Sequence, residues 1–451
     1  ASGTEASLLT LYHLAAGQGE AVESVLENAV VIVNPMFNPD GRDRFTDWAN
    51  RNRGEVASSD PQGREQNEPW PGGRTNHYWF DLNRDWLPLV HPESQGRVAL
   101  YHRWRPQVLT DYHEMGSDDT YFFMPGIQTR VNPETPARNQ ELTAEIAEYH
   151  AEYLDGIRAL YYSEEGYDDF YVGKGSTFPD VQGTVGILFE QASSRALERE
   201  TVNGVLTYPY TIRNQFLASL STLNAVVDLR EDLLRYQRDF YAGASEAAED
   251  KEVQGWVVAS DTRPVRSALL GQLLQSHRVR LHALAEEVTV DGRTFRPGEA
   301  WVVPVDQTQG RLVSAAMERV TTFTDSLFYD VSAWTLPLAY GVEHGELTSD
   351  PGNLLGEELG PVAAPQGELV GGEAEYAYLM EWGSYYAPRA LHRIQAAGVL
   401  PRLATRGFAA EVAGEVREFA PGTIIIPTGG LGADEETVHA GVAEAVENDH
   451  V

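Results

Sequence analysis

The alternation of apolar and polar positions predicts helices and short buried strands along the whole chain. Residues 1–16 have the spacing of a helix, and residues 28–33 (NAVVIV) have the unbroken apolar run of a buried strand. Further runs predict, in order, a helix at 93–104, a strand at 107–111, a helix at 136–162, a strand at 185–189 and a helix at 210–244. We therefore expect residues 1–244 to form one α/β domain with a mixed central sheet flanked by helices.

Residues 34–76 interrupt this pattern. They are rich in Asn, Asp, Gly, Pro and Arg, with turn signals at Asn38-Pro39-Asp40-Gly41 and Pro71-Gly72-Gly73. Long loops in compact domains are usually functional, so we expect a functional loop here.

The pattern changes after a polar, charged linker at 245–255. Residues 256–451 predict a smaller α/β domain made of two similar strand–helix–strand units, 256–341 and 376–451. Val279-Arg280-Leu281, predicted as a strand, matches Pro401-Arg402-Leu403 at a shift of 122 residues, and two Phe-x-Pro-Gly turns match at a shift of 124. These matches favour an internal duplication, although any two βαβ pieces share such a pattern.

Composition narrows the function classes. Among the 451 residues, 67 Asp and Glu outnumber 34 Lys and Arg, giving a net charge of −33, which argues against nucleic-acid binding. Cysteine is absent, which excludes disulfides, thiolate catalysis and cysteine-ligated zinc, so any metal site must use His, Asp and Glu. No apolar run approaches the ~18 residues of a membrane helix.

Chemistry-bearing residues follow the predicted strands. His113 comes just after the strand at 107–111, where α/β sheets form a ligand-binding crevice, and Glu190 closes the apolar strand at 185–189. A carboxylate in that position is costly unless paired or functional, and a raised pKa would suit it to general-base catalysis. Asn83-Arg84, before a helix, can grip a carboxylate. The alternatives are a hydrogen-bonded structural histidine and a surface turn.

The order and spacing of these features resemble the zinc metallocarboxypeptidases of the carboxypeptidase A type over about residues 1–244. The segments that carry the closer resemblance, to a large bacterial branch, are Asp111-Tyr-His-Glu-Met-Gly116, Gly173-Lys-Gly-Ser-Thr177 and Leu188-Phe-Glu-Gln-Ala-Ser-Ser-Arg195. In that branch a region similar to glutamine-amidotransferase-type domains often follows. Without cysteine its nucleophile is absent, so we expect a structural or binding role for residues 256–451.

The resemblance implies a zinc-dependent peptidase that acts on the C-termini of peptides or proteins. It makes His113 the third zinc ligand and Glu190 the general base that activates the zinc-bound water. Asn83 and Arg84 would hold the substrate's terminal carboxylate, and Tyr171, 19 residues before Glu190, would close over the substrate. An arginine after Asn-Pro-Asp-Gly would stabilise the oxyanion; spacing favours Arg53, then Arg51, also expected to contact substrate, then Arg44.

The chain departs from the family at its first two zinc ligands. These come from a His-x-x-Glu pair, and none of the twelve histidines is followed by Glu three positions later. In the family the pair lies just ahead of the helix that begins here at Ala1. We therefore expect sequence upstream of Ala1 to be missing and catalytic zinc to bind poorly, because catalytic zinc takes three protein ligands.

Two other interpretations stay open: an N-acyl amino acid deacylase of related fold, and a pseudoenzyme that binds peptide carboxylates without hydrolysis. An extracellular or periplasmic location is implied by the resemblance alone.

Overall fold

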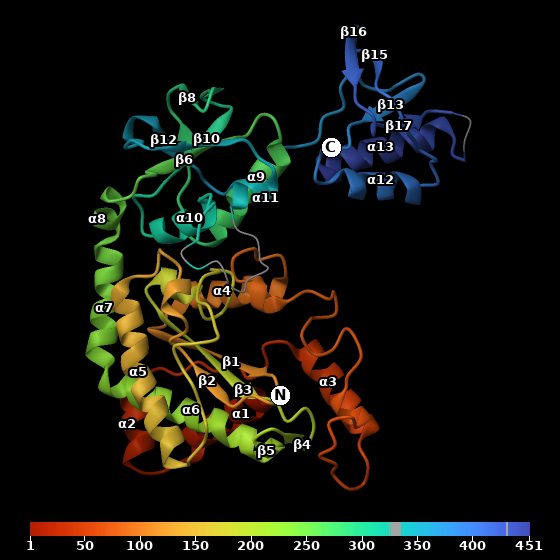
Figure 1. Cartoon of the computed structure of the whole chain (residues 1–451). Coiled ribbons are helices and arrows are strands. Elements are labelled where there is room, and N and C mark those ends of the chain that lie inside the picture. Colours follow the sequence, from red (N-terminus) through yellow and green to blue (C-terminus); the bar gives the residue numbers. More distant parts are fainter. Residues whose placement is uncertain (324, 326–334, 430–431) are drawn as a thin grey trace. The chain divides into compact units, whose positions relative to one another are not determined.

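The computed structural model describes residues 1–323, 325, 335–429 and 432–451 (Figure 1). It divides into two compact units. The first contains Ala1–Asp250 and Val305–Thr335, and the second contains Lys251–Pro304 and Leu336–Val451. Residues 305–335, expected in the C-terminal domain, thus belong to the first unit. None of the helices within the described ranges is long and apolar enough to cross a membrane.

The first unit is built on a three-stranded mixed sheet. Its strands are β1 (Val108–Met115), β2 (Tyr121–Phe123) and β3 (Val185–Ala192), and β3 lies between the other two (Figure 1). β1 runs parallel to β3 and β2 runs antiparallel to it. The mixed sheet flanked by helices agrees with the fold class expected from the sequence.

Helices surround this sheet. In chain order they are α1 (Ser2–Ala16), α2 (Glu20–Asn28), α3 (Pro39–Asn52), α4 (Pro92–Trp104), α5 (Ala137–Gly156), α6 (Tyr208–Asp228), α7 (Arg230–Ala242), α8 (Ala244–Glu249) and α10 (Gly310–Met317). A small hairpin, β4 (Glu198–Thr201) with β5 (Gly204–Thr207), and short 3-10 helices η1 (Arg64–Gln66), η2 (Leu82–Arg84), η3 (Gln128–Arg130) and η4 (Pro179–Gln182) complete the unit.

The core of the first unit forms where β3 meets α5 and α6. Ile187 and Phe189 of β3, Ile146 of α5 and Ala225 of α6 are all fully buried in one cluster. A strand made of Val, Ile, Leu and Phe loses little by being covered on both faces, because it carries no polar side chain there. Burial of this apolar run holds the strand, and with it Glu190, in the interior.

Three of the expected elements are wrong. Residues 28–33 form no strand: Val30 is 75% and Ile32 is 47% exposed, and no described strand pairs with them. An apolar run without a neighbouring ladder leaves its backbone groups unpaired, so the pattern alone does not secure a strand. The expected helix at 210–244 breaks at Leu229 into α6 and α7.

The third error concerns the expected loop at 34–76, because Asn38-Pro39-Asp40-Gly41 starts α3 instead of forming a turn. The Asn38 side chain accepts a hydrogen bond from the Gly41 N–H at 3.1 Å, and Pro39 takes the first helical position. Asn at the cap followed by Pro is a strong helix start as well as a turn signal.

The second unit contains two separate sheets. The first has the order β11-β6-β10-β7-β12, and the second has the order β13-β17-β14. The strands are β6 (Gly255–Ala259), β7 (His282–Leu284), β10 (Ala300–Pro304), β11 (His344–Leu347), β12 (Leu355–Glu358), β13 (Ala377–Met380), β14 (Arg402–Leu403) and β17 (Ile424–Pro427). The helices are α9 (Pro264–Ser276), α11 (Leu336–Tyr340), α12 (Ala387–Ala396) and α13 (Glu435–Asp449), with η5 at Gly352–Leu354.

Both sheets contain the same core arrangement. In each, the first and second strands in chain order pair with opposite edges of the last strand, giving β6-β10-β7 and β13-β17-β14, all antiparallel. Between them each carries a hairpin, β8 (Val288–Val290) with β9 (Arg293–Phe295), and β15 (Phe408–Val412) with β16 (Glu415–Phe419). This shared order supports the duplication, which stays a prediction.

The local turns repeat as well. Gly298 and Gly422, the last residues of the two Phe-x-Pro-Gly turns, have φ of +84° and +99°. The strand predicted at 279–281 begins three residues later, at His282. Residues 279–281, which the sequence match aligned with 401–403, therefore precede β7, whereas residues 402–403 form β14.

Gly186 offers a test of how β3 is packed. A Cβ there would lie 1.8 Å from the carbonyl oxygen of Ser176. We expect Gly186→Ala to destabilise the first unit by about 1–3 kcal/mol or more, because backbone must move to admit the methyl group. The matched control is Gly96→Ala on exposed α4, where a Cβ meets open space; it should stabilise by about 0.4–1 kcal/mol. Urea unfolding measures both, and an unaffected Gly186→Ala protein would contradict this packing.

Candidate active site

Two predicted site residues lie opposite each other at the ends of parallel strands. His113 of β1 is in register with Glu190 of β3. Cα partners on neighbouring strands point their side chains to the same face, so the imidazole and the carboxylate share one side of the sheet. The sheet thus brings together the two residues that the sequence singled out on separate strands.

Asp111 and Asn83 hold the imidazole of His113. Asp111, two residues earlier on β1, places Oδ1 2.9 Å from His113 Nε2. The Asn83 amide nitrogen lies 3.0 Å from both Asp111 Oδ2 and His113 Nε2, and the Asn83 oxygen accepts from the Gly175 N–H at 2.9 Å. Asn83, expected to hold substrate, is therefore fully engaged in bracing His113.

The electrostatics of this pair are mutual. Burial acts to raise the pKa of Asp111, but His113 and Asn83 outweigh it and the pKa of Asp111 is lowered. Burial acts to lower the pKa of His113, but Asp111 and Glu190 outweigh it and the pKa of His113 is raised. The two groups therefore favour the charged pair, carboxylate with imidazolium.

The glycine-rich segment 173–177 closes against this network. A Cβ on Gly175 would lie 2.7 Å from Asp111 Oδ2, and a Cβ on Gly173 would lie 2.2 Å from the Tyr171 ring. Only glycine allows such close approach. The Gly-Lys-Gly spacing of the sequence is thus explained by contact with the site.

Glu190 is the one residue of β3 that is not fully buried. Burial raises its pKa to about 7, against the lowering effect of His113 and Arg74. A carboxylate that titrates near neutrality can take up and return a proton at low cost, which is the property a general base needs.

The arginine that reaches the site is one that the sequence analysis missed. Arg74 acts electrostatically on Asp111, His113 and Glu190. It forms an ion pair with Asp81 at 2.9 Å, and Asp81 in turn accepts from the Asn83 N–H at 2.9 Å.

The three arginines favoured by spacing lie on α3 or at its C-terminal end. Arg53 follows the end of α3 and is exposed, and Arg51 pairs with Asp47 at 2.7 Å. Arg44 donates to the carbonyls of Gly72, Thr75 and Asn76. Arg74 stands nine residues before Asn83 in the sequence.

Tyr171 and Arg84 are hydrogen-bonded to each other next to Asn83. Tyr171 is 3% exposed, and its hydroxyl donates to the Arg84 carbonyl at 3.3 Å. The Arg84 guanidinium donates to the Asn83 carbonyl at 3.0 Å.

Two other tyrosines have hydroxyls whose pKa responds to the charge of Glu190. Tyr162 and Tyr167 are half-buried, and both donate to the Met115 sulfur, at 3.3 and 3.2 Å. Burial and then the charge of Glu190 raise the pKa of Tyr167 well above its usual value, and burial chiefly raises the pKa of Tyr162 to about 12. Both hydroxyls therefore stay protonated near neutral pH and can donate hydrogen bonds.

Glu114, next to His113, faces the other way and caps α1. It accepts from the Ser2 N–H at 2.8 Å and from the Ser2 hydroxyl at 2.6 Å. A carboxylate at a helix N-terminus is stabilising, so Glu114 positions α1 beside β1.

The residues around His113 do not fit a catalytic zinc ion by themselves. The bond between its Nε2 atom and Asp111 leaves Nδ1 as the ring nitrogen that could bind a metal ion. Within the described ranges, the group of three metal-ligating side chains whose ligand atoms converge is Asp40, His77 and Glu93, and it does not include His113. Because catalytic zinc takes three protein ligands, no step of a reaction can be assigned to a metal at His113.

Comparison with known proteins bears on the family that the first unit resembles. The family described as zinc carboxypeptidase matches residues 1–178, so the resemblance found in the motifs is confirmed for this part of the chain. Glu190 lies beyond the matched residues. No curated protein matches the chain.

Two solved structures are similar to it at low identity. A metallo-carboxypeptidase from Burkholderia cenocepacia has 14% identity and a TM-score of 0.35, covering 50% of this chain and 53% of that one. One from Pseudomonas aeruginosa, in complex with (2-guanidinoethylmercapto)succinic acid, has 16% identity and a TM-score of 0.35, covering 51% and 54%. The chain spans about half the length of these proteins.

The raised pKa of Glu190 predicts a pH-dependent stability. Between pH 4.5 and 7 the folded state binds a proton on Glu190 that the unfolded state has released, so stability falls as the pH rises through this window. We expect Glu190→Gln to stabilise the first unit by about 1–3 kcal/mol at pH 8 and by little at pH 4.5. Urea unfolding at both pH values measures this. A variant less stable than the parent at pH 8 would instead make Glu190 an essential ion-pair partner.

Proposed function

We propose that the first unit carries a carboxypeptidase-type site that recognises the C-termini of peptides or proteins and hydrolyses the terminal amide bond. The observation that carries this proposal is the pair of His113 and Glu190, in register on parallel strands and braced by Asn83. The family match over residues 1–178 supports the substrate class. The exported location implied by the resemblance is part of the same proposal.

Glu190 is the proposed general base. It removes a proton from a water molecule as the water oxygen attacks the scissile carbonyl carbon, and it then delivers that proton to the leaving amine as the C–N bond breaks. A pKa of about 7 suits both transfers. The exposed guanidinium of Arg74 is the proposed partner of the developing oxyanion, in place of Arg53, because its charge already reaches Glu190 and His113.

Arg84 is the proposed anchor for the terminal carboxylate, since a guanidinium binds a carboxylate through two parallel hydrogen bonds. Asn83 is proposed as a positioning residue, because both ends of its amide are already bonded within the protein. Tyr162 and Tyr167 replace Tyr171 as the tyrosines proposed to contact substrate, because both half-buried hydroxyls lie in the electrostatic field of Glu190.

A second function is favoured by the side chains around His113. The described residues there do not supply two further zinc ligands. A site with this arrangement can bind a peptide carboxylate without cleaving the amide bond. The two functions share the recognition step and differ in turnover.

Binding of free carboxylates tests the shared step. We expect Arg84→Ala to weaken binding of a free-acid peptide by about 1.5–3 kcal/mol, as expected for a lost charged contact, and to leave the C-terminally amidated peptide almost unchanged. Calorimetry with both peptides measures this. Arg53→Ala, which removes an exposed arginine, is the matched control and should affect neither. Equal losses for the two peptides in Arg84→Ala would refute the anchoring role.

Turnover separates the two functions. If the chain hydrolyses peptides, Glu190→Gln should lower kcat by at least about 100-fold while free-acid peptides still bind, because the substitution keeps the shape and removes the basicity. Product analysis by mass spectrometry follows release of the terminal residue. A chain that binds free-acid peptides with no turnover supports the binding function, and an active Glu190→Gln variant would mean that another residue is the base.

A further inference from the structure

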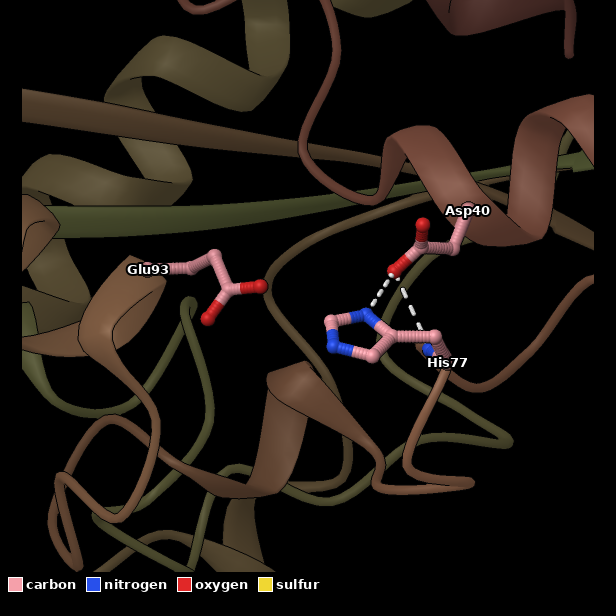
Figure 2. Close-up of side chains that lie close together, drawn as sticks. All are labelled: Asp40, His77 and Glu93. Carbon is pink, nitrogen blue, oxygen red and sulfur yellow. Dashed lines mark hydrogen bonds and ion pairs between the residues drawn. The ribbon is translucent and has the colours of Figure 1, made fainter.

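Three side chains from separate elements converge outside the candidate active site. Asp40 stands in the first turn of α3, Glu93 stands in the first turn of α4, and His77 lies in the segment between them. Their ligand atoms all lie within 4.8 Å of one another, and both carboxylates reach toward the imidazole ring (Figure 2). None of the three belongs to the His113–Glu190 network.

Asp40 and His77 are held together by two contacts. Asp40 Oδ2 lies 2.7 Å from His77 Nδ1 and accepts from the His77 N–H at 3.0 Å (Figure 2). The hydrogen bond from His77 is the main cause that lowers the pKa of Asp40. The two side chains thus place an oxygen and a nitrogen side by side, the ligand atoms that divalent transition metals bind.

The backbone around Asp40 and His77 is fixed before any ligand binds. A Cβ on Gly41 would lie 2.1 Å from the carbonyl oxygen of Gly73, so α3 and the segment before His77 touch backbone to backbone. Arg44 of α3 also donates to the carbonyls of Gly72 and Asn76, at 2.8 and 2.9 Å. These contacts fix the distance between Asp40 and His77.

The start of α4, which carries Glu93, is joined to the same segment. The side-chain nitrogen of Asn76, next to His77, lies 3.3 Å from Nδ1 of His91, the residue that precedes α4. The His91 N–H in turn donates to Asp85 at 2.9 Å. The three candidate ligands thus stand on a scaffold of direct bonds, which is the preorganisation that a binding site requires.

Glu93 lacks a hydrogen-bond partner in the described part of the chain. Its Oε2 atom is buried and unpaired. Arg97, one turn further along α4, interacts with Glu93 through its charge, but its guanidinium stacks on Phe37, 3.5 Å from the ring centre, and donates to the Phe37 carbonyl. A buried carboxylate oxygen without a donor is costly, and a bound cation would remove that cost.

We propose that Asp40, His77 and Glu93 bind a divalent transition-metal ion through one imidazole nitrogen and two carboxylate oxygens. This donor set suits Zn²⁺ and its neighbours in the first transition row. The His77 side chain is 55% exposed, which leaves room for water to complete the coordination. The bound ion would join α3, the segment around His77 and α4.

The opposing interpretation is structural. Asp40 and His77 would form a plain ion pair, and Glu93 would stabilise the N-terminus of α4 through the helix dipole. In that case the three residues affect stability without any dependence on metal.

Zinc binding to the 451-residue chain separates the two interpretations. After treatment with a chelator and dialysis, titration with Zn²⁺ followed by calorimetry should reveal a site that takes one ion per chain. We expect His77→Ala and Glu93→Gln each to weaken this site at least about tenfold. His113→Ala and His392→Ala, the latter an exposed histidine of the second unit, are the matched controls and should leave it within about twofold.

The variants also keep the test independent of folding. Glu93→Gln preserves the size of the side chain and removes no hydrogen bond between described residues. It does remove a charge that acts on Arg97 and on the N-terminus of α4, so its melting temperature without zinc should fall slightly. In the parent, added zinc should raise the melting temperature, and in Glu93→Gln it should raise it less. No zinc binding, binding that survives both substitutions, or binding lost only in His113→Ala would overturn the proposal. The test does not depend on peptide binding or turnover.

Discussion

Parallel pairing between β1 and β3 is the interaction on which the candidate active site depends. It sets His113 beside Glu190, and the apolar residues of β3 hold that pairing in the interior between α5 and α6. The glycine-rich segment then lies directly on β3, because Gly186 leaves space for the Ser176 carbonyl. Displacing β3 by one residue would turn Glu190 to the opposite face and separate it from the imidazole.

Charge compensation is the second condition that the site satisfies. Asp111, His113 and Glu190 are all largely removed from water, which is unfavourable for each of them as an isolated ion. Asp111 and His113 stabilise each other's charged form. Glu190 is less well compensated, so burial raises its pKa to about 7. Arg74, at the exposed edge, moderates this shift through its charge. The protonation behaviour of the site is therefore a property of the whole cluster.

The sequence predicted the strands β1 and β3 and the pair at their ends. An apolar run indicates a buried strand, and an ionisable residue that ends the run marks a position with a possible function. It failed where the outcome depends on a partner distant in sequence. Residues 28–33 are apolar yet find no ladder, and the loop expected around Asp40 contains α3. Arg74 was missed for the same reason. Its charge acts on Glu190 only in the folded structure, and spacing along the chain does not record that.

Residues 305–335 have a consequence for the modularity of the chain. α10 lies in this segment and contacts η4, beside the glycine-rich loop, and Arg311 donates to the Glu134 carbonyl at 2.8 Å. The chain therefore leaves the first unit, builds part of the second, and returns before completing the second. Neither unit is a contiguous stretch of sequence, so a single cut in the chain cannot release either unit intact.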